Sequence, residues 1–199
     1  MNVSAYFASL GIREEHFRLE QTHFDRESHL HGIAHTYRVM THCLVLGAAS
    51  GYHRESLIAF CGAFIHDMAR QNDGRCEYHG QWAAERKLHQ HSKRFFSEGI
   101  TDGEVSVIAE IVTGHSLPGD VQVEKKNIPL AILKDADALD RIRLGEGNLK
   151  PEFLRLSQSG SFIGYAQALY CAATERASTC SFEEYLALSS ALLRGVGSR

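Results

Sequence analysis

Apolar residues recur at helical spacing along most of the chain, and polar turn residues separate these stretches. From residue 33 to about 50, apolar side chains return every three or four positions, and Gly51 offers a stop. A second stretch, from about 54 to 64, has the same periodicity and leads directly into the pair His66 and Asp67. The pattern therefore predicts two helices, the second of which delivers this pair at its C-terminal end.

The middle of the chain continues in the same way. The segment 71–79, with the sequence QNDGRCEYH, contains turn chemistry and is predicted to be a loop before a polar amphipathic helix over about 80–96. Thr101 followed by Glu104 is the signature of a capping box, and the apolar stripe after it leads to His115. We expect His115 to lie at the end of that helix.

The next predicted helix carries carboxylates on an apolar stripe. After a predicted loop over 116–127, Pro129 can open a helix in which Asp137 and Asp140 share a face with leucines at three- and four-residue spacing. A charged group on such a face needs a partner or a function. Spacing alone does not say which aspartate of this helix has that function.

Two more helices are predicted over about 161–176 and 181–194, the second with a capping box at Ser181 and Glu184. The chain has only three prolines, and each falls where the periodicity is interrupted. No internal repeat or linker divides the sequence. We therefore predict an all-α, compact helical bundle that forms a single domain over residues 1–199.

Composition narrows the possible functions. Hydrophobic residues make up 44% of the 199 positions, and the formal net charge is −3, so a nucleic acid is not an expected partner. No stretch approaches the roughly 20 apolar residues of a membrane span, and we expect a cytoplasmic protein without a membrane partner. The five cysteines have irregular spacing and no CxxC pair, which favours reduced thiols over disulfides or a zinc ribbon.

Histidine and aspartate at a few positions carry the candidate chemistry. His35, His66, Asp67 and Asp137 come from three predicted helices and have side chains that bind hard or borderline cations. His66 and Asp67 follow the apolar run 63–65, where an unpaired charge would be costly. A bound cation is one of the few ways to satisfy them.

Four segments carry the histidines and aspartates just described: HGIAHTYRV (31–39), AFIHDMARQNDG (63–74), EIVTGHS (110–116) and LKDADALDRI (133–142). Together they resemble the HD-domain superfamily of metal-dependent phosphohydrolases. Their order along the chain is more specific than any one of them. The resemblance covers roughly residues 30–143 and implies a helical core of the HD-domain type, on which the C-terminal helices over about 161–194 pack.

The resemblance implies a divalent metal ion held by His35, His66, Asp67 and Asp137. The metal can be Mn, Fe, Co, Ni, Zn or Mg, since the ligand types do not separate them. Spacing alone leaves Asp135 and Asp140 as alternatives to the fourth ligand, and the resemblance favours Asp137.

Three further side chains are candidates for a second metal ion or for substrate phosphate. Some proteins similar to this one use additional histidines in the regions of His79 and His115 to hold a second ion. The alternative for His115 is an interaction with its helix dipole, and the alternative for His79 is an exposed loop position. Lys134 can reach a phosphate oxygen or remain solvated, and His31 can orient His35, contact substrate or serve as a capping residue.

Phosphate hydrolysis is the function that the resemblance implies, with a metal-activated water attacking phosphorus. Candidate catalytic groups are Asp67, which can position the water, His115, which can protonate the leaving oxygen, and Asp73, which is otherwise part of a turn. Arg38 and Arg141 lie on predicted helices beside this carboxylate-rich site, and the alternative to a catalytic role is that they pair with Asp140 or Asp135. The sequence has no Gly-rich phosphate loop, so substrate recognition would depend on the metal and on scattered side chains. The resemblance implies a nucleotide or another small phosphorylated metabolite as the substrate.

Two alternatives remain open. Small proteins that look like HD-domain hydrolases include mixed-valent diiron oxygenases, whose ligands are four histidines and two aspartates. The matching set here is His35, His66, Asp67, His79, His115 and Asp137. The other alternative is a non-enzymatic binding module with a degenerate metal site.

Overall fold

The structure is a computed structural model that describes residues 1–145, 147–176 and 180–196. Its helices are α1 (Val3–Ser9), α2 (Ile33–Ser50), α3 (His53–Ile65), α4 (His79–Trp82), α5 (Leu88–Ser97), α6 (Asp102–His115), α7 (Val121–Glu124), α8 (Ile128–Asp140), α9 (Ile163–Glu175) and α10 (Phe182–Val196). No residue in the three described ranges lies in a β-strand, and the predicted all-α, compact fold is confirmed.

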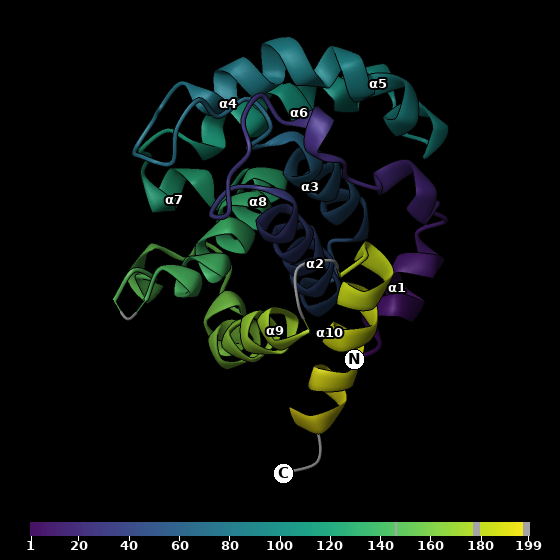
Figure 1. Ribbon diagram of the computed structural model, residues 1–199, viewed down its shortest axis with the longest axis vertical. Coiled ribbons are helices and arrows are strands. Elements are labelled where there is room, and N and C mark those ends of the chain that lie inside the picture. Colours follow the sequence, from purple (N-terminus) through teal and green to yellow (C-terminus); the bar gives the residue numbers. More distant parts are fainter. Residues whose placement is uncertain (146, 177–179, 197–199) are drawn as a thin grey trace.

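Helix α2 lies in the middle of the molecule, with α3 and α8 packed beside it (Figure 1). All residues from His35 to Gly47 are buried. The helix ends at Gly51, which adopts a left-handed φ of 74°. A Cβ atom at Gly47 would lie 2.2 Å from Ser56 Cβ on α3, so this glycine is what allows α2 and α3 to approach so closely.

Helix α3 ends where the sequence predicted, immediately before His66 and Asp67. The whole of its second half is buried, including the residues Ala63, Phe64 and Ile65. Burial of the final turn holds the pair in the interior of the protein. The two side chains are 0% and 3% exposed.

The predicted capping boxes of α6 and α10 are both present. Thr101 and Glu104 bond reciprocally at the start of α6. Ser181 N donates to Glu184 Oε2 at 2.7 Å, and Glu184 N donates to Ser181 Oγ at 3.3 Å. Helix α6 ends at His115, as expected.

The helix predicted over 80–96 is not continuous. It begins as α4, passes through a π-helical turn at Ala83–Lys87 and continues as α5. A Cβ atom at Gly80 would lie 2.3 Å from Val112 O, so α4 packs directly against the last turns of α6. Apolar periodicity does not reveal the extra residue of a π turn, which is why the prediction missed it.

The two ends of the chain complete the core. Helix α1, which the sequence pattern did not predict, packs on α10: the Phe7 and Phe182 rings lie 5.6 Å apart and edge to face. On α9, Tyr165 and Leu169 are buried. Helix α7 is a second element that the pattern missed, because it is a four-residue turn inside a predicted loop.

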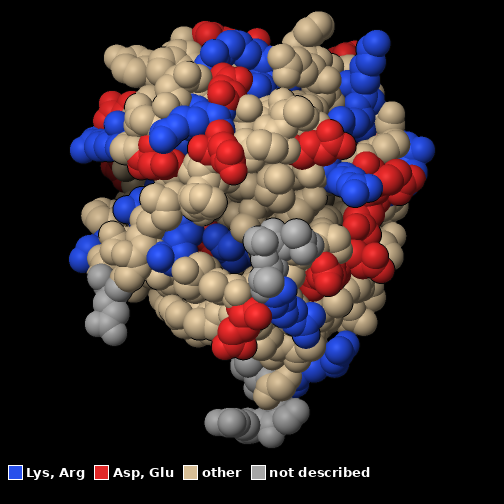
Figure 2. Space-filling model, viewed as in Figure 1, with Lys and Arg blue, Asp and Glu red and all other residues tan. Residues whose placement is uncertain are grey.

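Lys and Arg side chains are interspersed with Asp and Glu over most of the face shown in Figure 2, and several Asp and Glu side chains lie together along its right side. None of the described helices is long and apolar enough to cross a membrane.

Candidate metal centre

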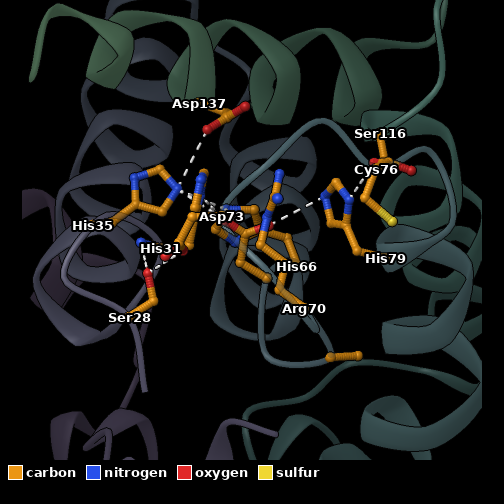
Figure 3. Close-up of polar contacts among 12 residues, drawn as sticks. Ser28, His31, His35, His66, Arg70, Asp73, Cys76, His79, Ser116 and Asp137 are labelled. Carbon is orange, nitrogen blue, oxygen red and sulfur yellow. Dashed lines mark hydrogen bonds and ion pairs between the residues drawn. The ribbon is translucent and has the colours of Figure 1, made fainter. Parts of the chain in front are cut away.

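Six side chains from five parts of the fold converge in the interior. They are His35 on α2, His66 and Asp67 after α3, His79 at the start of α4, His115 at the end of α6, and Asp137 on α8. Figure 3 shows His35 and Asp137 on one side of this cluster and His79 on the other. Five of the six side chains are at most 5% exposed, and only Asp137, at 31%, reaches solvent.

One half of the cluster contains the four ligands expected from the sequence. His35 Nε2 lies 3.2 Å from His66 Nε2, 3.3 Å from Asp67 Oδ2 and 3.4 Å from Asp137 Oδ1. Two nitrogen ligands that bind one ion at about 2.1 Å and about 90° to each other lie about 3.0 Å apart. These separations are therefore short enough for the atoms to hold one cation.

The other half contains the two candidate histidines. His79 Nε2 lies 3.0 Å from His115 Nε2, and Asp67 Oδ1 lies 3.2 Å and 4.0 Å from these two nitrogens. The two oxygens of Asp67 thus face different halves of the cluster. The arrangement brings His79, His115 and Asp67 together in the way that a second ion would require.

The hydrogen bonds of the four histidines indicate which ring nitrogen carries the proton. Each Nδ1 bonds to an oxygen that accepts: His35 to Asp140 Oδ2, His66 to the carbonyl of Ala63, His79 to that of Cys76, and His115 to that of Val112. A neutral imidazole has a single N–H, so a ring that donates from Nδ1 presents a lone pair at Nε2. Lone pairs that face each other at 3.0 to 3.2 Å repel unless a proton or a metal ion lies between them.

Charge and burial favour the forms in which these groups bind metals. Burial disfavours the imidazolium and lowers the pKa of His66 to about 4 and that of His115 to about 3. Burial opposes the charge on Asp67, but the surrounding histidines outweigh it and hold its pKa well below the ordinary value. Neutral rings beside an ionised carboxylate are the ligand forms that metal binding needs.

His35 differs from the other rings. Burial and the charge of Arg143 oppose its protonation, but the hydrogen bonds to Asp140 and Asp67 outweigh them and raise its pKa. Since Nδ1 is already engaged with Asp140, the additional proton sits on Nε2, on the side of Asp67. A proton and a divalent cation therefore compete for the same lone pair.

The structure separates the three aspartates of α8. Asp140 is fully buried and accepts from His35 Nδ1 at 2.7 Å and from Arg38 Nε at 2.5 Å, so it orients a ligand ring and does not face the cluster. Asp135 accepts from the backbone N–H groups of Arg155 and Leu156 on the far side of the helix. Of the three, Asp137 is the one whose carboxylate faces His35 Nε2, on the side of the cluster.

Two arginine side chains contact the carboxylates of the cluster and its surroundings, and the sequence interpretation had not identified them. Arg70 Nε donates to Asp67 Oδ1 at 2.8 Å, and Arg143 Nη1 lies 3.3 Å from Asp140 Oδ2. Each arginine follows its carboxylate by three residues. That spacing could have suggested the pairs, because one helical turn brings such side chains together.

His31 contacts the cluster directly. Its Nδ1 lies 2.9 Å from Asp67 Oδ2, and its side chain is 13% exposed. Its ligand atom is also within 4.8 Å of those of His35 and Asp67. His31 therefore lies at the boundary between the buried ligands and solvent.

The remaining candidates lie outside the cluster. Asp73 Oδ1 accepts a hydrogen bond from Ser28 Oγ at 2.5 Å, and none of its described contacts is with a ligand atom. Lys134 is 6% exposed, pairs with Glu124 and donates to the carbonyl of Leu117 at 2.8 Å. Arg38 pairs with Asp140 as considered above, whereas Arg141 Nε donates to a backbone carbonyl.

The model of the HD domain family matches residues 32–142, more than half of the 199-residue chain. The chain belongs to the HD domain family. This family is one of metal-dependent hydrolases, and the matched range contains all six members of the cluster. Comparison with curated proteins returned no match, and comparison with solved structures returned none either.

Proposed function

We propose that this HD-domain protein is a phosphohydrolase with two divalent metal ions bound in the histidine–aspartate cluster. The observation that carries the proposal is the pairing of Nε2 lone pairs, at 3.2 Å between His35 and His66 and at 3.0 Å between His79 and His115. Each pair faces one oxygen of Asp67. One cation held by His35, His66 and Asp67, and a second held by His79, His115 and Asp67, would account for these contacts.

His35, His66, Asp67 and Asp137 would hold the first ion, and Asp67, His79 and His115 the second. When bound, the ions lower the pKa of a coordinated water and offset negative charge on phosphoryl oxygens. Four and three protein ligands leave open positions for water and phosphate. The ligand types suit Mn, Fe, Co, Ni, Zn or Mg.

The residues around the cluster have distinct roles in this proposal. Arg70 and His31 hydrogen-bond to the two oxygens of Asp67 and so fix its orientation between the two halves. Asp140 holds the His35 ring through Nδ1. Orientation of ligands by such contacts typically changes metal affinity or activity by roughly 10- to 100-fold.

We assign proton donation to His31 instead of His115. His115 carries no proton at Nε2 near neutral pH, because its Nδ1 donates to the carbonyl of Val112 and burial lowers its pKa to about 3. His31 borders solvent beside Asp67 and can deliver a proton to a leaving oxygen there. Asp73 is one hydrogen bond further out, through Ser28, whose Oγ also accepts from His31 N.

The substrate proposed is a phosphate ester or anhydride of a small metabolite or nucleotide. The test is phosphate release from a panel of such compounds by metal-supplemented protein, in wild type and in Asp67→Ala. Release that Asp67→Ala loses and Asp102→Asn retains supports the proposal; Asp102 is an exposed aspartate at the start of α6. Full activity of Asp67→Ala would contradict it.

A diiron oxygenase is the second candidate, because the cluster brings together four histidines and two aspartates from five parts of the fold. Iron content and oxygen consumption distinguish the two functions. Two irons per chain, oxygen uptake with an organic substrate and no phosphate release would favour the oxygenase. Protein that retains no metal and releases no phosphate would favour a binding module.

A further inference from the structure

Arg143 lies beside His31, the residue at the boundary between the buried ligands and solvent. Its Nη2 is 3.4 Å from His31 Nδ1, and that nitrogen is 2.9 Å from Asp67 Oδ2. The side chain of Arg143 is only 4% exposed. The guanidinium is therefore a buried cation that is separated from a candidate metal ligand by a single histidine ring.

Two backbone carbonyls hold the guanidinium in this position. Arg143 Nε donates to the carbonyl of Leu30 at 3.1 Å, and Nη1 donates to that of Asp140 at 3.0 Å. Leu30 directly precedes His31, and Asp140 is the last residue of α8, the helix that carries Asp137. The arginine thus connects the two segments whose side chains lead from solvent to the cluster, and Nη2 is the nitrogen that neither carbonyl uses.

The positive charge of Arg143 has no carboxylate of its own. Among the described residues its one carboxylate contact is between Nη1 and Asp140 Oδ2, at 3.3 Å. That carboxylate already accepts from Arg38 Nε at 2.5 Å, from Arg38 Nη2 at 3.0 Å and from His35 Nδ1 at 2.7 Å. A guanidinium is always charged in proteins, so one negative charge serves two of them and one positive charge remains beside the cluster.

Arg143 Nη2 also lacks a suitable acceptor. A lone pair on His31 Nδ1 would face an oxygen of the Asp67 carboxylate at 2.9 Å, so this nitrogen carries a proton and donates to Asp67. It cannot at the same time accept from Arg143, and no other acceptor contacts Nη2 in the part of the chain that the structure describes. A buried donor in this state is costly, and an oxygen atom of an anionic ligand would satisfy it.

We propose that Arg143 binds the phosphoryl group of the substrate and selects terminal phosphoryl groups over phosphodiesters. The inference rests on the phosphohydrolase function proposed above and narrows its substrate class. A terminal phosphoryl group has three non-bridging oxygens and nearly two negative charges at neutral pH, whereas a diester has two such oxygens and one charge. When metal ions engage two of these oxygens, the terminal group retains a third for Nη2, and the diester retains none.

The first test measures the binding of inorganic phosphate to metal-supplemented protein by titration calorimetry. Arg143→Met removes the guanidinium but keeps a long side chain, and Kd should rise roughly 10- to 100-fold because a charge-assisted hydrogen bond is lost. Arg141→Met is the matched control. It removes the same charge from the same 3-10 helical turn (Arg141–Leu144), where Arg141 Nε donates to the carbonyl of Asn148. The control should change Kd less than about twofold.

The second test measures selectivity with p-nitrophenyl phosphate and bis(p-nitrophenyl) phosphate, which share a leaving group. Arg143→Met should lower kcat/KM at least about 10-fold for the monoester and less than about threefold for the diester. Arg143→Lys should lie between wild type and Arg143→Met for the monoester, because a point charge replaces the planar fork. Elemental analysis and urea unfolding of each variant measure its metal content and stability.

The outcomes separate this inference from the proposed function. If wild type releases phosphate and Arg143→Met binds inorganic phosphate as tightly as wild type, the phosphohydrolase function stands and the role of Arg143 is wrong. Equal losses for monoester and diester, or loss of metal in both Arg143→Met and Arg143→Lys, would show a structural role and also overturn the inference. If wild type releases no phosphate but Arg143→Met still weakens phosphate binding, the phosphohydrolase function fails and the phosphate contact stands.

Discussion

Two sets of buried histidines in this protein differ in how their ring nitrogens are used. In the candidate metal centre, rings such as His66 and His115 donate from Nδ1 to a backbone carbonyl and direct Nε2 at another histidine of the cluster. His42 on α2 and His91 on α5 are also buried, at 0% and 4% exposure, but neither of their nitrogens has a hydrogen-bond partner among the described residues.

The comparison shows that burial alone does not mark a histidine as a ligand. His42 lies two turns after His35 on the same helix, and its ring packs against Tyr165 at 5.7 Å. Burial lowers the pKa of His42 to about 4, much as it does for His66. In the candidate metal centre, by contrast, a hydrogen bond from Nδ1 orients each ring, and Nε2 lies close to other possible metal ligands.

The largest predicted effect separates two aspartates on α8. Asp137→Ala should reduce phosphate release to background and remove the first metal ion, with little change in folding, because its carboxylate is a partly exposed ligand. Asp135→Ala should instead destabilise the fold by about 3 kcal/mol, since it leaves the buried N–H of Leu156 and the O–H of Ser159 unpaired. Urea unfolding and elemental analysis of both variants measure this difference, and equal metal loss in both would contradict it.

The two halves of the centre should also be separable. His115→Ala should lower the metal content from two ions per chain to one, because it removes a ligand of the second half and leaves His35 and His66 in place. Exposed His89→Ala on α5 is the control and should retain both ions. Elemental analysis after identical dialysis gives the result, and loss of both ions in His115→Ala would argue against independent halves.

A smaller effect is expected from the residue that orients His35. Asp140→Asn keeps the size of the side chain but removes its charge beside Arg38 and His35. Metal affinity should fall roughly 10- to 100-fold while the same ligands remain. Competition with a metal chelator, combined with the visible spectrum of cobalt-substituted protein, measures affinity and ligand geometry together; unchanged affinity would show that Asp140 does not support the site.

The smallest effect concerns a histidine outside the centre. Burial lowers the pKa of His91 to about 3, and the charges of Arg94, His23 and Lys87 act in the same direction. The unfolded chain binds a proton at its ordinary pKa near 6.5, so stability is complete above that pH and is lost as the pH falls toward 3. At pH 5 the loss is at most about 2 kcal/mol.

His91→Phe should remove this part of the acid sensitivity, since a phenyl ring can keep the packing against Phe64. Urea unfolding at pH 7.5 and pH 5 should show a smaller loss for His91→Phe than for wild type. His89→Phe on the exposed face of the same helix should behave like wild type. Identical pH dependence of wild type and His91→Phe would contradict the expectation.

Much of the fold could be read from the sequence, because the signals involved are local. The bounds of α2, the end of α3 before His66 and the capping boxes all depend on residues within a few positions of each other. The short α1 and α7 and the π turn at Ala83–Lys87 were missed, since none has enough periodicity to stand out.

The candidate site was predicted less completely, for a physical reason. Spacing placed Asp137 and Asp140 on one face of a helix and could not say which meets the metal. The choice is made by Arg38, which lies 102 residues away in sequence from Asp140 and occupies its carboxylate. Likewise, Lys134 was a phosphate candidate until the structure paired it with Glu124. Pairings between distant segments leave no periodic trace in the sequence.

The central claim is that Asp67 would help to hold two divalent metal ions, one in each half of the cluster, and the most direct measurement is elemental analysis of purified wild type and Asp67→Asn. The substitution keeps the shape of the side chain and removes the charge that faces both halves of the cluster. We predict two divalent ions per chain in wild type and fewer than one in Asp67→Asn. Wild-type metal content in Asp67→Asn would contradict the account.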